Sequence, residues 1–255
     1  MPNLLSFDGS YEGFLCIIHD HYYKKITPSS IQTDLALQQA LDADEYHVST
    51  DYKKAYKVLQ GIRSKISTQA ENYLFHSFLS EDNDMYMDMF NYVKLGFKVG
   101  CKVDFYMQKD YVLNVHKMAR YVAKEAHLLC GFSRFLETKN KVFYCEVTPI
   151  NDVLPLLAEY FIDRMKYQAW VIHDTKRNKA AIYDGSKYVI DYVPKNNIYL
   201  EFSDKEEYIQ DLWRSFFNAV SIKERENKSL QRNLVPLYFR KNMTEFKIPV
   251  GNNGK

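Results

Sequence analysis

The sequence predicts an α+β protein that is rich in helices and has a small antiparallel β-meander in its C-terminal half. Apolar residues recur three and four positions apart along several segments, which is typical of helices with one buried face. Three short strand-like segments follow one another after residue 168, separated by turn-forming residues. Because helices and strands mix without a regular βαβ rhythm, the pattern favours α+β over α/β.

Residues 1–85 are predicted to form an N-terminal region that is mainly helical. The segment Phe7–Ser10 is typical of a short strand or turn that leads into a helix, with Ser10 as the N-cap. A candidate strand over 47–50 precedes a helix over 51–66, which Asp51 is placed to cap. A further helix is expected over 69–79.

Residues 86–250 are predicted to form an α+β core domain, followed by a disordered tail over 251–255. A helix is expected over 86–97, and the clearest helix of the chain is expected over 110–133. The core-facing stripe of this second helix consists of Tyr111, Val115, Met118, Val122, Ala126 and Leu129.

The rest of the core domain carries the predicted strands. A strand over 141–147 is followed by a helix that begins near Asn151, its expected cap, and runs to about residue 165. Two helices, over 205–222 and 229–245, complete the domain, the second bent at Pro236. The β-meander lies between these helices, at 169–173, 179–183 and 188–192.

Composition and length indicate a globular protein of one large domain or two closely packed ones. The chain has 255 residues, of which 46% are hydrophobic and 26% are charged, and these proportions are ordinary for a folded protein. No apolar run approaches the roughly 20 residues that span a bilayer, and the N-terminus lacks the pattern of a secretory signal. We therefore expect a cytoplasmic protein without membrane contact.

The sequence contains no complete cofactor or metal motif, so none is predicted. Phosphate-binding glycine loops, a dinucleotide-binding glycine pattern and a serine-hydrolase elbow are all missing. His19 and His21 would point about 200° apart on a helix and could not share one ion there. The four cysteines are too widely spaced for a zinc ribbon or an iron–sulfur cluster, which favours free thiols in a reducing cytosol.

The helix over 110–133 carries candidate acid–base residues. Glu125 falls at the edge of the apolar stripe, where a carboxylate would be partly desolvated and would need a basic partner. His116, Arg120 and His127 share the opposite face. The structural alternative is a solvated basic face with one buried ion pair. The enzymatic hypothesis is action on a damaged base or nucleoside by groups near one pocket, namely Glu125, His127, His173 and Asp174.

A second concentration of positive charge lies near the C-terminus. The net charge of the chain is only +2, so any nucleic-acid interface must come from local clustering. Residues 221–247 contain seven basic and three acidic residues. A soluble surface explains the same counts, but side chains there are also suited to phosphate contacts or base edges, with Tyr238 and Phe239 available for stacking. The polar candidates are Arg225, Asn227, Gln231 and Arg232.

Several ordered segments resemble one uncharacterised bacterial family of probable DNA-metabolism proteins. Each segment alone is short, but together they run through nearly the whole chain in order. They are Phe7–Phe14, Glu125–Phe135, Asp152–Leu157, Ile172–Asp174 with Arg177 and Ala180, Leu212–Arg214, Ile222 with Glu224, Arg225 and Asn227, Leu230–Arg232, and Met243–Phe246.

The resemblance implies a gene beside a radical-SAM protein that modifies or repairs DNA, and some relatives are fused to a uracil-DNA glycosylase domain. We expect no such fused domain here, because the chain ends soon after Thr244–Phe246. The three-cysteine cluster motif of the radical-SAM partner is also missing. Relatives often have His-Phe where this chain has Tyr160-Phe161.

The leading hypothesis is therefore an accessory protein of DNA repair or modification that binds nucleic acid, a radical-SAM partner, or both. Guanidinium groups match phosphate oxygens, so arginines are the expected contacts. The alternatives are the enzyme described above and a protein scaffold without DNA contact. The predicted nucleic-acid-binding residues are Arg120, Arg134, Arg177, Arg214, Arg225, Asn227 and Arg232.

Overall fold

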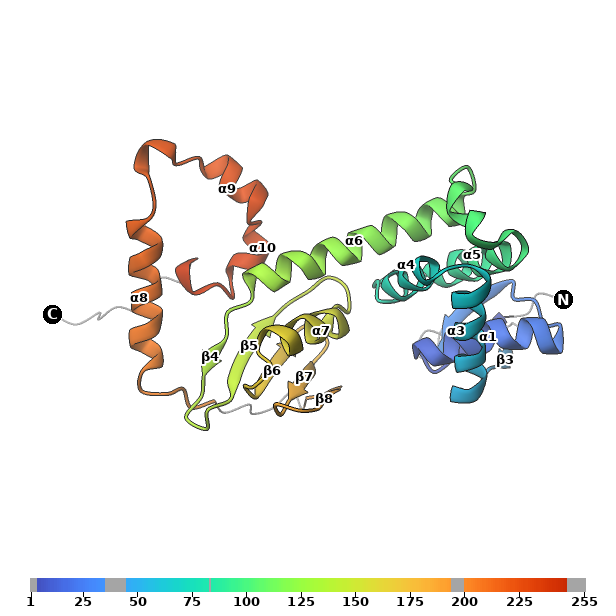
Figure 1. Cartoon of the computed structure of the whole chain (residues 1–255), viewed down its shortest axis with the longest axis horizontal. Helices are drawn as coiled ribbons and strands as arrows, with labels where there is room; N and C mark the ends of the chain where they lie inside the picture. Colours follow the sequence, from blue (N-terminus) through green and yellow to red (C-terminus); the bar gives the residue numbers. More distant parts are fainter. Residues whose placement is uncertain (1–3, 35–44, 83, 194–199, 247–255) are drawn as a thin grey trace. The chain divides into compact units, whose positions relative to one another are not determined.

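The computed structural model describes residues 4–34, 45–82, 84–193 and 200–246 (Figure 1). It divides into two compact units, Met1–Lys124 (unit 1) and Glu125–Lys255 (unit 2). The long helix α6 (Asp110–Phe132) contributes residues to both. The predicted tail over 251–255 lies outside the described residues. Among the helices of the described part of the chain, none is long and apolar enough to cross a membrane.

Unit 1 combines a small parallel sheet with helices. The strands have the order β2-β1-β3 and comprise β2 (Ser30–Thr33), β1 (Leu4–Phe7) and β3 (Glu45–His47). Besides the start of α6, the unit contains α1 (Tyr11–Lys24), α3 (Tyr52–Lys65), α4 (Thr68–Phe78), α5 (Met85–Val99) and the 3-10 helix η1 (Gly100–Phe105).

Short polar side chains set where the first helices of unit 1 begin. The side chain of Ser10 accepts a hydrogen bond from the Gly13 amide, and Asp51 accepts from the amides of Lys53 and Lys54. Both caps satisfy amides that lack partners within the first turn. The two predicted caps are confirmed, and they present the apolar faces of α1 and α3 to a core that includes Phe7, Phe14 and Ile62.

The position of His116 differs from the predicted solvated face of α6. His116 is buried, and its Nε2 lies 2.9 Å from Asp104 Oδ1. The imidazole also packs near the rings of Tyr73 and Tyr92. A helical projection locates the main apolar stripe but does not reveal that η1 and α4 cover a second face, so the prediction for His116 was wrong.

Unit 2 is built on a five-stranded sheet with the order β4-β5-β6-β7-β8. β5 and β6 are parallel, and the other neighbours are antiparallel. The predicted α+β class and C-terminal β-meander are therefore confirmed. The strands are β4 (Leu136–Glu137), β5 (Phe143–Val147), β6 (Trp170–Asp174), β7 (Lys179–Tyr183) and β8 (Tyr188–Tyr192).

Helix α7 (Leu154–Arg164) connects the parallel strands β5 and β6 and packs on the sheet (Figure 1). Its residues Leu157 and Phe161 are buried, as is Trp170 on β6. The cap position lies two residues later than predicted, at Val153, and the side chain of Asn151 bonds to Glu125 instead of capping the helix.

The C-terminal part of unit 2 is a series of helices after the sheet. The predicted helix over 229–245 is broken, since Pro236 cannot continue a helix and the chain turns there. Asn227 caps the segment that follows it by accepting from the Leu230 amide. The elements are α8 (Glu206–Ala219), the 3-10 helix η2 (Lys223–Arg225), α9 (Lys228–Leu234), α10 (Leu237–Arg240) and the 3-10 helix η3 (Thr244–Phe246).

Candidate functional site

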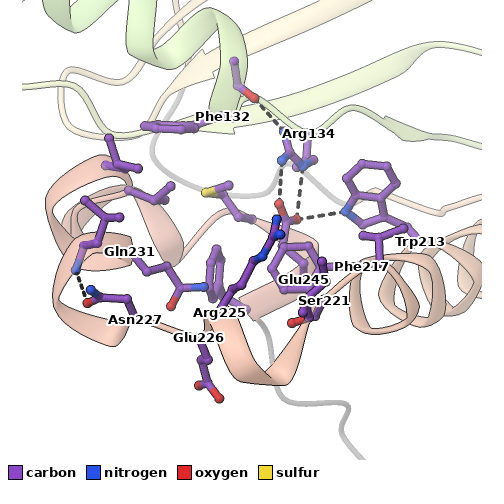
Figure 2. Close-up of a pocket in the computed structure, with 18 residues that line it drawn as sticks. Phe132, Arg134, Trp213, Phe217, Ser221, Arg225, Glu226, Asn227, Gln231 and Glu245 are labelled. Carbon is purple, nitrogen blue, oxygen red and sulfur yellow. Dashed lines mark hydrogen bonds and ion pairs between the residues drawn. The ribbon is translucent and has the colours of Figure 1, made fainter.

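A cavity of about 680 Å³ lies in unit 2, between the C-terminal end of α6 and the helices that follow the sheet (Figure 2). This volume is within the range of small-molecule sites, roughly 300–1,000 Å³. Its walls are mostly apolar and include four aromatic rings, with a few polar and charged groups among them. The rings are those of Phe132, Trp213, Phe217 and Phe246.

One side of the cavity is closed by an ion pair between Arg134 and Glu245. Arg134 donates from Nη2 to Glu245 Oε1 at 2.5 Å and from Nε to Oε2 at 3.1 Å. Trp213 Nε1 donates to the same Oε2 at 3.0 Å, and the Trp213 ring lies 5.5 Å from the guanidinium carbon. Arg134 Nη1 donates to the carbonyls of Gly131 and Ser133. We call the Arg134–Glu245–Trp213 group the clamp (Figure 2).

The clamp fixes the charge of Glu245. Its side chain is only 3% exposed, and burial alone would raise the pKa of this carboxyl. The hydrogen bonds from Arg134 and Trp213 outweigh burial and lower the pKa of Glu245 below its ordinary value of 4.5. Because the pair is bidentate and shielded, the clamp joins α8 and η3 to the end of α6, and the Arg134 charge is neutralised there.

Arg225 adds a further cation to the cavity lining, together with the polar side chains of Asn227 and Gln231. Within the described residues, Arg225 has no ion pair. Asn227 uses its Oδ1 to accept from the Leu230 amide at 2.9 Å, so this oxygen caps α9. Arg232 is exposed on α9 but is not among the residues that line the cavity. The structure thus brings Arg225, Asn227 and the clamp to one cavity.

Two other predicted phosphate-binding arginines already have acidic partners. Arg177 Nη1 lies 3.0 Å from Asp174 Oδ2, and Arg214 Nη2 lies 2.5 Å from Asp211 Oδ1. A guanidinium paired in this way attracts an external phosphate less than an unpaired one. Arg120 is exposed on α6 but belongs to unit 1.

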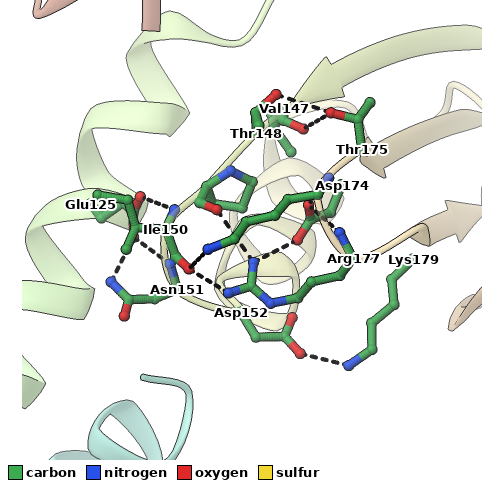
Figure 3. Close-up of polar contacts among 12 residues, drawn as sticks. Glu125, Val147, Thr148, Ile150, Asn151, Asp152, Asp174, Thr175, Arg177 and Lys179 are labelled. Carbon is green, nitrogen blue, oxygen red and sulfur yellow. Dashed lines mark hydrogen bonds and ion pairs between the residues drawn. The ribbon is translucent and has the colours of Figure 1, made fainter. Parts of the chain in front are cut away.

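Glu125 holds the loop between β5 and α7 (Figure 3). It is 5% exposed, and its two oxygens accept from Ile150 N at 2.6 Å, Asn151 N at 3.0 Å and Asn151 Nδ2 at 2.7 Å. On the other side of the loop, Arg177 donates to the carbonyls of Pro149 and Ile150 while it pairs with Asp174. The loop is therefore fixed from both sides by charged groups (Figure 3).

The four predicted acid–base residues point in different directions. His173 and Asp174 are neighbours on β6, so their side chains leave opposite faces of the sheet. His173 Nδ1 lies 2.7 Å from the Tyr144 hydroxyl, and burial lowers the pKa of this imidazole. His127 is exposed and follows Glu125 by two positions on α6, which places it about 200° around the helix.

The fold and the cavity define an α+β protein with an aromatic, arginine-containing pocket in its C-terminal unit. The chain belongs to the family described as "Domain of unknown function (DUF4130)", whose model matches residues 83–245. A search of curated proteins finds no match to the chain. Across the residues that the structure describes, no three His, Cys, Asp or Glu side chains gather in a way that could hold a metal ion.

The cavity collects several of the segments on which the sequence resemblance rests. Glu125–Phe135, Leu212–Arg214, Leu230–Arg232 and Met243–Phe246 all contribute lining residues. Sequence reasoning selected Arg134 and Arg225 but missed Glu245 and Trp213. The available signal for Glu245 was an acid that follows Arg240 and Lys241 in a basic segment, but its partner lies 111 residues away in the sequence.

Proposed function

We propose that this chain is an accessory protein of DNA repair or modification that binds nucleic acid at the unit 2 cavity. The observation that carries the proposal is the guanidinium of Arg225, which has no ion pair within the described residues and lines a cavity with four aromatic rings. Nucleic acid presents phosphates and flat bases together, and proteins contact these with cations and aromatic side chains respectively. The resemblance to probable DNA-metabolism proteins supports the same class of ligand.

In this proposal the charged groups have different roles. Arg225 and Arg232 contact phosphates, since both are exposed and have no acidic partner within the described residues. Arg134 shapes the cavity through Glu245 and does not bind phosphate itself. A base enters the apolar part of the cavity and stacks there, with Asn227 Nδ2 and Gln231 available to bond its edge.

DNA binding at this cavity should depend strongly on salt concentration. For the wild-type chain we expect affinity that falls steeply with salt, and Arg225→Ala and Arg232→Ala should each lower the log–log slope by about 0.7 to 0.9. Arg214→Ala is the matched control, because Arg214 is paired with Asp211 and should change the slope less. Fluorescence anisotropy with labelled single- and double-stranded DNA measures the affinity of the wild type and the three variants at each salt concentration.

Two results would contradict the proposal. One is a lack of binding to either form of DNA at low salt. The other is a set of equal slopes for Arg225→Ala, Arg232→Ala and the wild type, which would remove the cavity from the interface.

The exposed apolar face of α8 favours a second function, a scaffold that binds a protein without DNA contact. Leu212, Phe216 and Val220 recur at intervals of four and are 56%, 55% and 58% exposed. An apolar stripe of this kind on a soluble protein marks an interaction surface. The partner proposed here is the radical-SAM protein that the resemblance implies.

The scaffold function predicts a complex that survives without nucleic acid. Leu212→Asp combined with Phe216→Asp should abolish copurification with the co-expressed radical-SAM protein after nuclease treatment, whereas Arg225→Ala should not. If the double variant still copurifies to the wild-type extent, the α8 face is not the docking surface.

A further inference from the structure

Unit 1 contains a second cavity, of about 500 Å³, among α1, α3 and α5. Of its lining residues, only Phe97 falls within the segment that the family model matches. The proposed nucleic-acid site in unit 2 shares no residue with it. The cavity therefore requires its own explanation.

Aromatic rings form one part of the wall. The imidazole of His19 stacks on Tyr23 with centroids 4.2 Å apart and planes 10° apart. Tyr22 meets Phe97 edge to face at 5.4 Å. Tyr23 is 59% exposed. His19 covers one face of its ring, and the Lys57 ammonium also lies over the ring. Rings fixed by such contacts form a suitable surface for stacking.

Lysines of α3 form the other part of the cavity wall. Lys57 Nζ lies 4.4 Å from the centre of the Tyr23 ring, and Lys65 lies two turns further along the same helix face. Neither lysine has an ion pair within the described residues, and no carboxylate is among the residues that line the cavity. The neighbouring acid Asp20 is 4% exposed, bonds to Lys24 at 2.6 Å and lies 3.3 Å from Nδ1 of the lining residue His19, so it is already paired. The cavity is thus positively charged.

Gly61 opens the space between the two lysines. It lies four residues from each, in the interior of α3, where glycine costs about 1 kcal/mol relative to alanine. A Cβ at this position would lie 3.5 Å from Phe97 Cζ, an ordinary contact, so nothing in the backbone demands glycine. A side chain longer than alanine, however, would project toward Phe97 and occupy the cavity.

We propose that this cavity binds a nucleotide unit, an aromatic base that carries a phosphate. The base takes the place of the Lys57 ammonium over the Tyr23 ring, on which His19 is already stacked, and Lys57 then contacts the phosphate together with Lys65. An acidic peptide would use the lysines but not the rings, so the combination favours a nucleotide. The same chemistry is present in a free nucleotide and in a single strand of nucleic acid.

The test uses the full chain and two probes, AMP and a short oligothymidylate, in calorimetric titrations at low salt. Lys57→Ala and Lys65→Ala should each weaken binding about tenfold, the usual loss for a charge-assisted contact. Gly61→Leu should abolish binding. Lys98→Ala is the matched control, since this exposed lysine of α5 is not among the lining residues and should leave affinity unchanged. Thermal melting checks that each variant is folded.

Binding of AMP by the wild type, weakened by the lysine variants, identifies a free nucleotide as sufficient. Binding of oligothymidylate alone identifies a single strand. The Arg225→Ala variant separates this site from the one in unit 2. It should still bind AMP, or it should keep the part of oligothymidylate binding that depends on Lys57. The proposal is overturned if neither probe binds, if both lysine variants behave like Lys98→Ala, or if polyglutamate binds as tightly as oligothymidylate.

Discussion

Replacing Glu125 by alanine is expected to destabilise unit 2 by about 3–5 kcal/mol, because it removes a buried carboxylate that accepts three hydrogen bonds. The carboxylate accepts hydrogen bonds from the amides of Ile150 and Asn151 and from the Asn151 side chain, at 2.6 to 3.0 Å. Alanine removes the acceptor of all three hydrogen bonds in a site where Glu125 is 5% exposed. The loop between β5 and α7 would then lose the interaction that fixes it.

Urea unfolding followed by circular dichroism measures this loss. Glu125→Gln retains the shape and one carbonyl oxygen, so its loss should be smaller than that of Glu125→Ala. His127→Ala is the matched control on the same helix, because His127 is exposed and its removal should change stability by less than about 0.5 kcal/mol. Equal urea midpoints for Glu125→Ala and His127→Ala would show that the loop does not depend on Glu125.

The outcome also separates a structural role of Glu125 from a catalytic one. A general base needs an oxygen free to take a proton from a substrate, whereas both oxygens of Glu125 already accept hydrogen bonds from the chain. The other buried carboxylate of the predicted set, Asp174, accepts from the amides of Lys176 and Arg177 and pairs with the Arg177 side chain. The hydrogen bonds of Glu125 and of Asp174 therefore favour a structural role for both carboxylates.

Local features of this fold were predictable because they depend on a few consecutive residues. The caps Ser10 and Asp51 satisfy the amides of their own helices, and the limits of β7 and β8 follow from alternation and turn residues. The extent of α6 follows from its apolar stripe. Each of these signals lies within the element that it defines.

Contacts across the chain were not predictable in this way. Asn151 has the side chain and the position typical of a helix cap. However, its backbone amide and its side chain both donate hydrogen bonds to Glu125, 26 residues earlier. The sequence does not show whether an acidic side chain lies next to a basic one in the fold. Arg177 and Arg225 were therefore equivalent candidates for phosphate binding until their neighbours were known. The one distinguishing property of Arg225, its lack of an acidic partner within the described residues, is purely three-dimensional.

The second large effect is expected for Arg134→Ala, which removes the basic partner of Glu245. A buried carboxylate that loses its partner costs about 3–5 kcal/mol, and Glu245 is 3% exposed against 21% for Arg134. Trp213 reports the change, because its Nε1 bonds to the same carboxylate and the only other tryptophan, Trp170, is buried in the sheet. We expect Trp213 fluorescence to change at a lower urea concentration than in the wild type, with Arg214→Ala as control.

The pH dependence of the clamp has a fixed sign. The folded-state pKa of Glu245 is lowered below 4.5. The contribution of this carboxylate to the stability of the fold is therefore fully present above pH 4.5 and is lost as the pH falls through the folded-state pKa. Acidification should therefore change the fluorescence of Trp213 in the wild type. Glu245→Gln should remove this acid-dependent change. An unchanged acid transition in Glu245→Gln would assign the step to another group.

The clamp and Arg225 act on the same cavity by different means, and their variants can be told apart. Arg134→Ala should weaken DNA binding only together with a loss of stability, because Arg134 holds the wall formed by α8 and η3. Arg225→Ala should weaken DNA binding while the melting temperature stays unchanged, since no ion pair of Arg225 exists within the described residues. If both variants lost binding without loss of stability, Arg134 would itself contact the ligand, and the ion pair with Glu245 would have to open first.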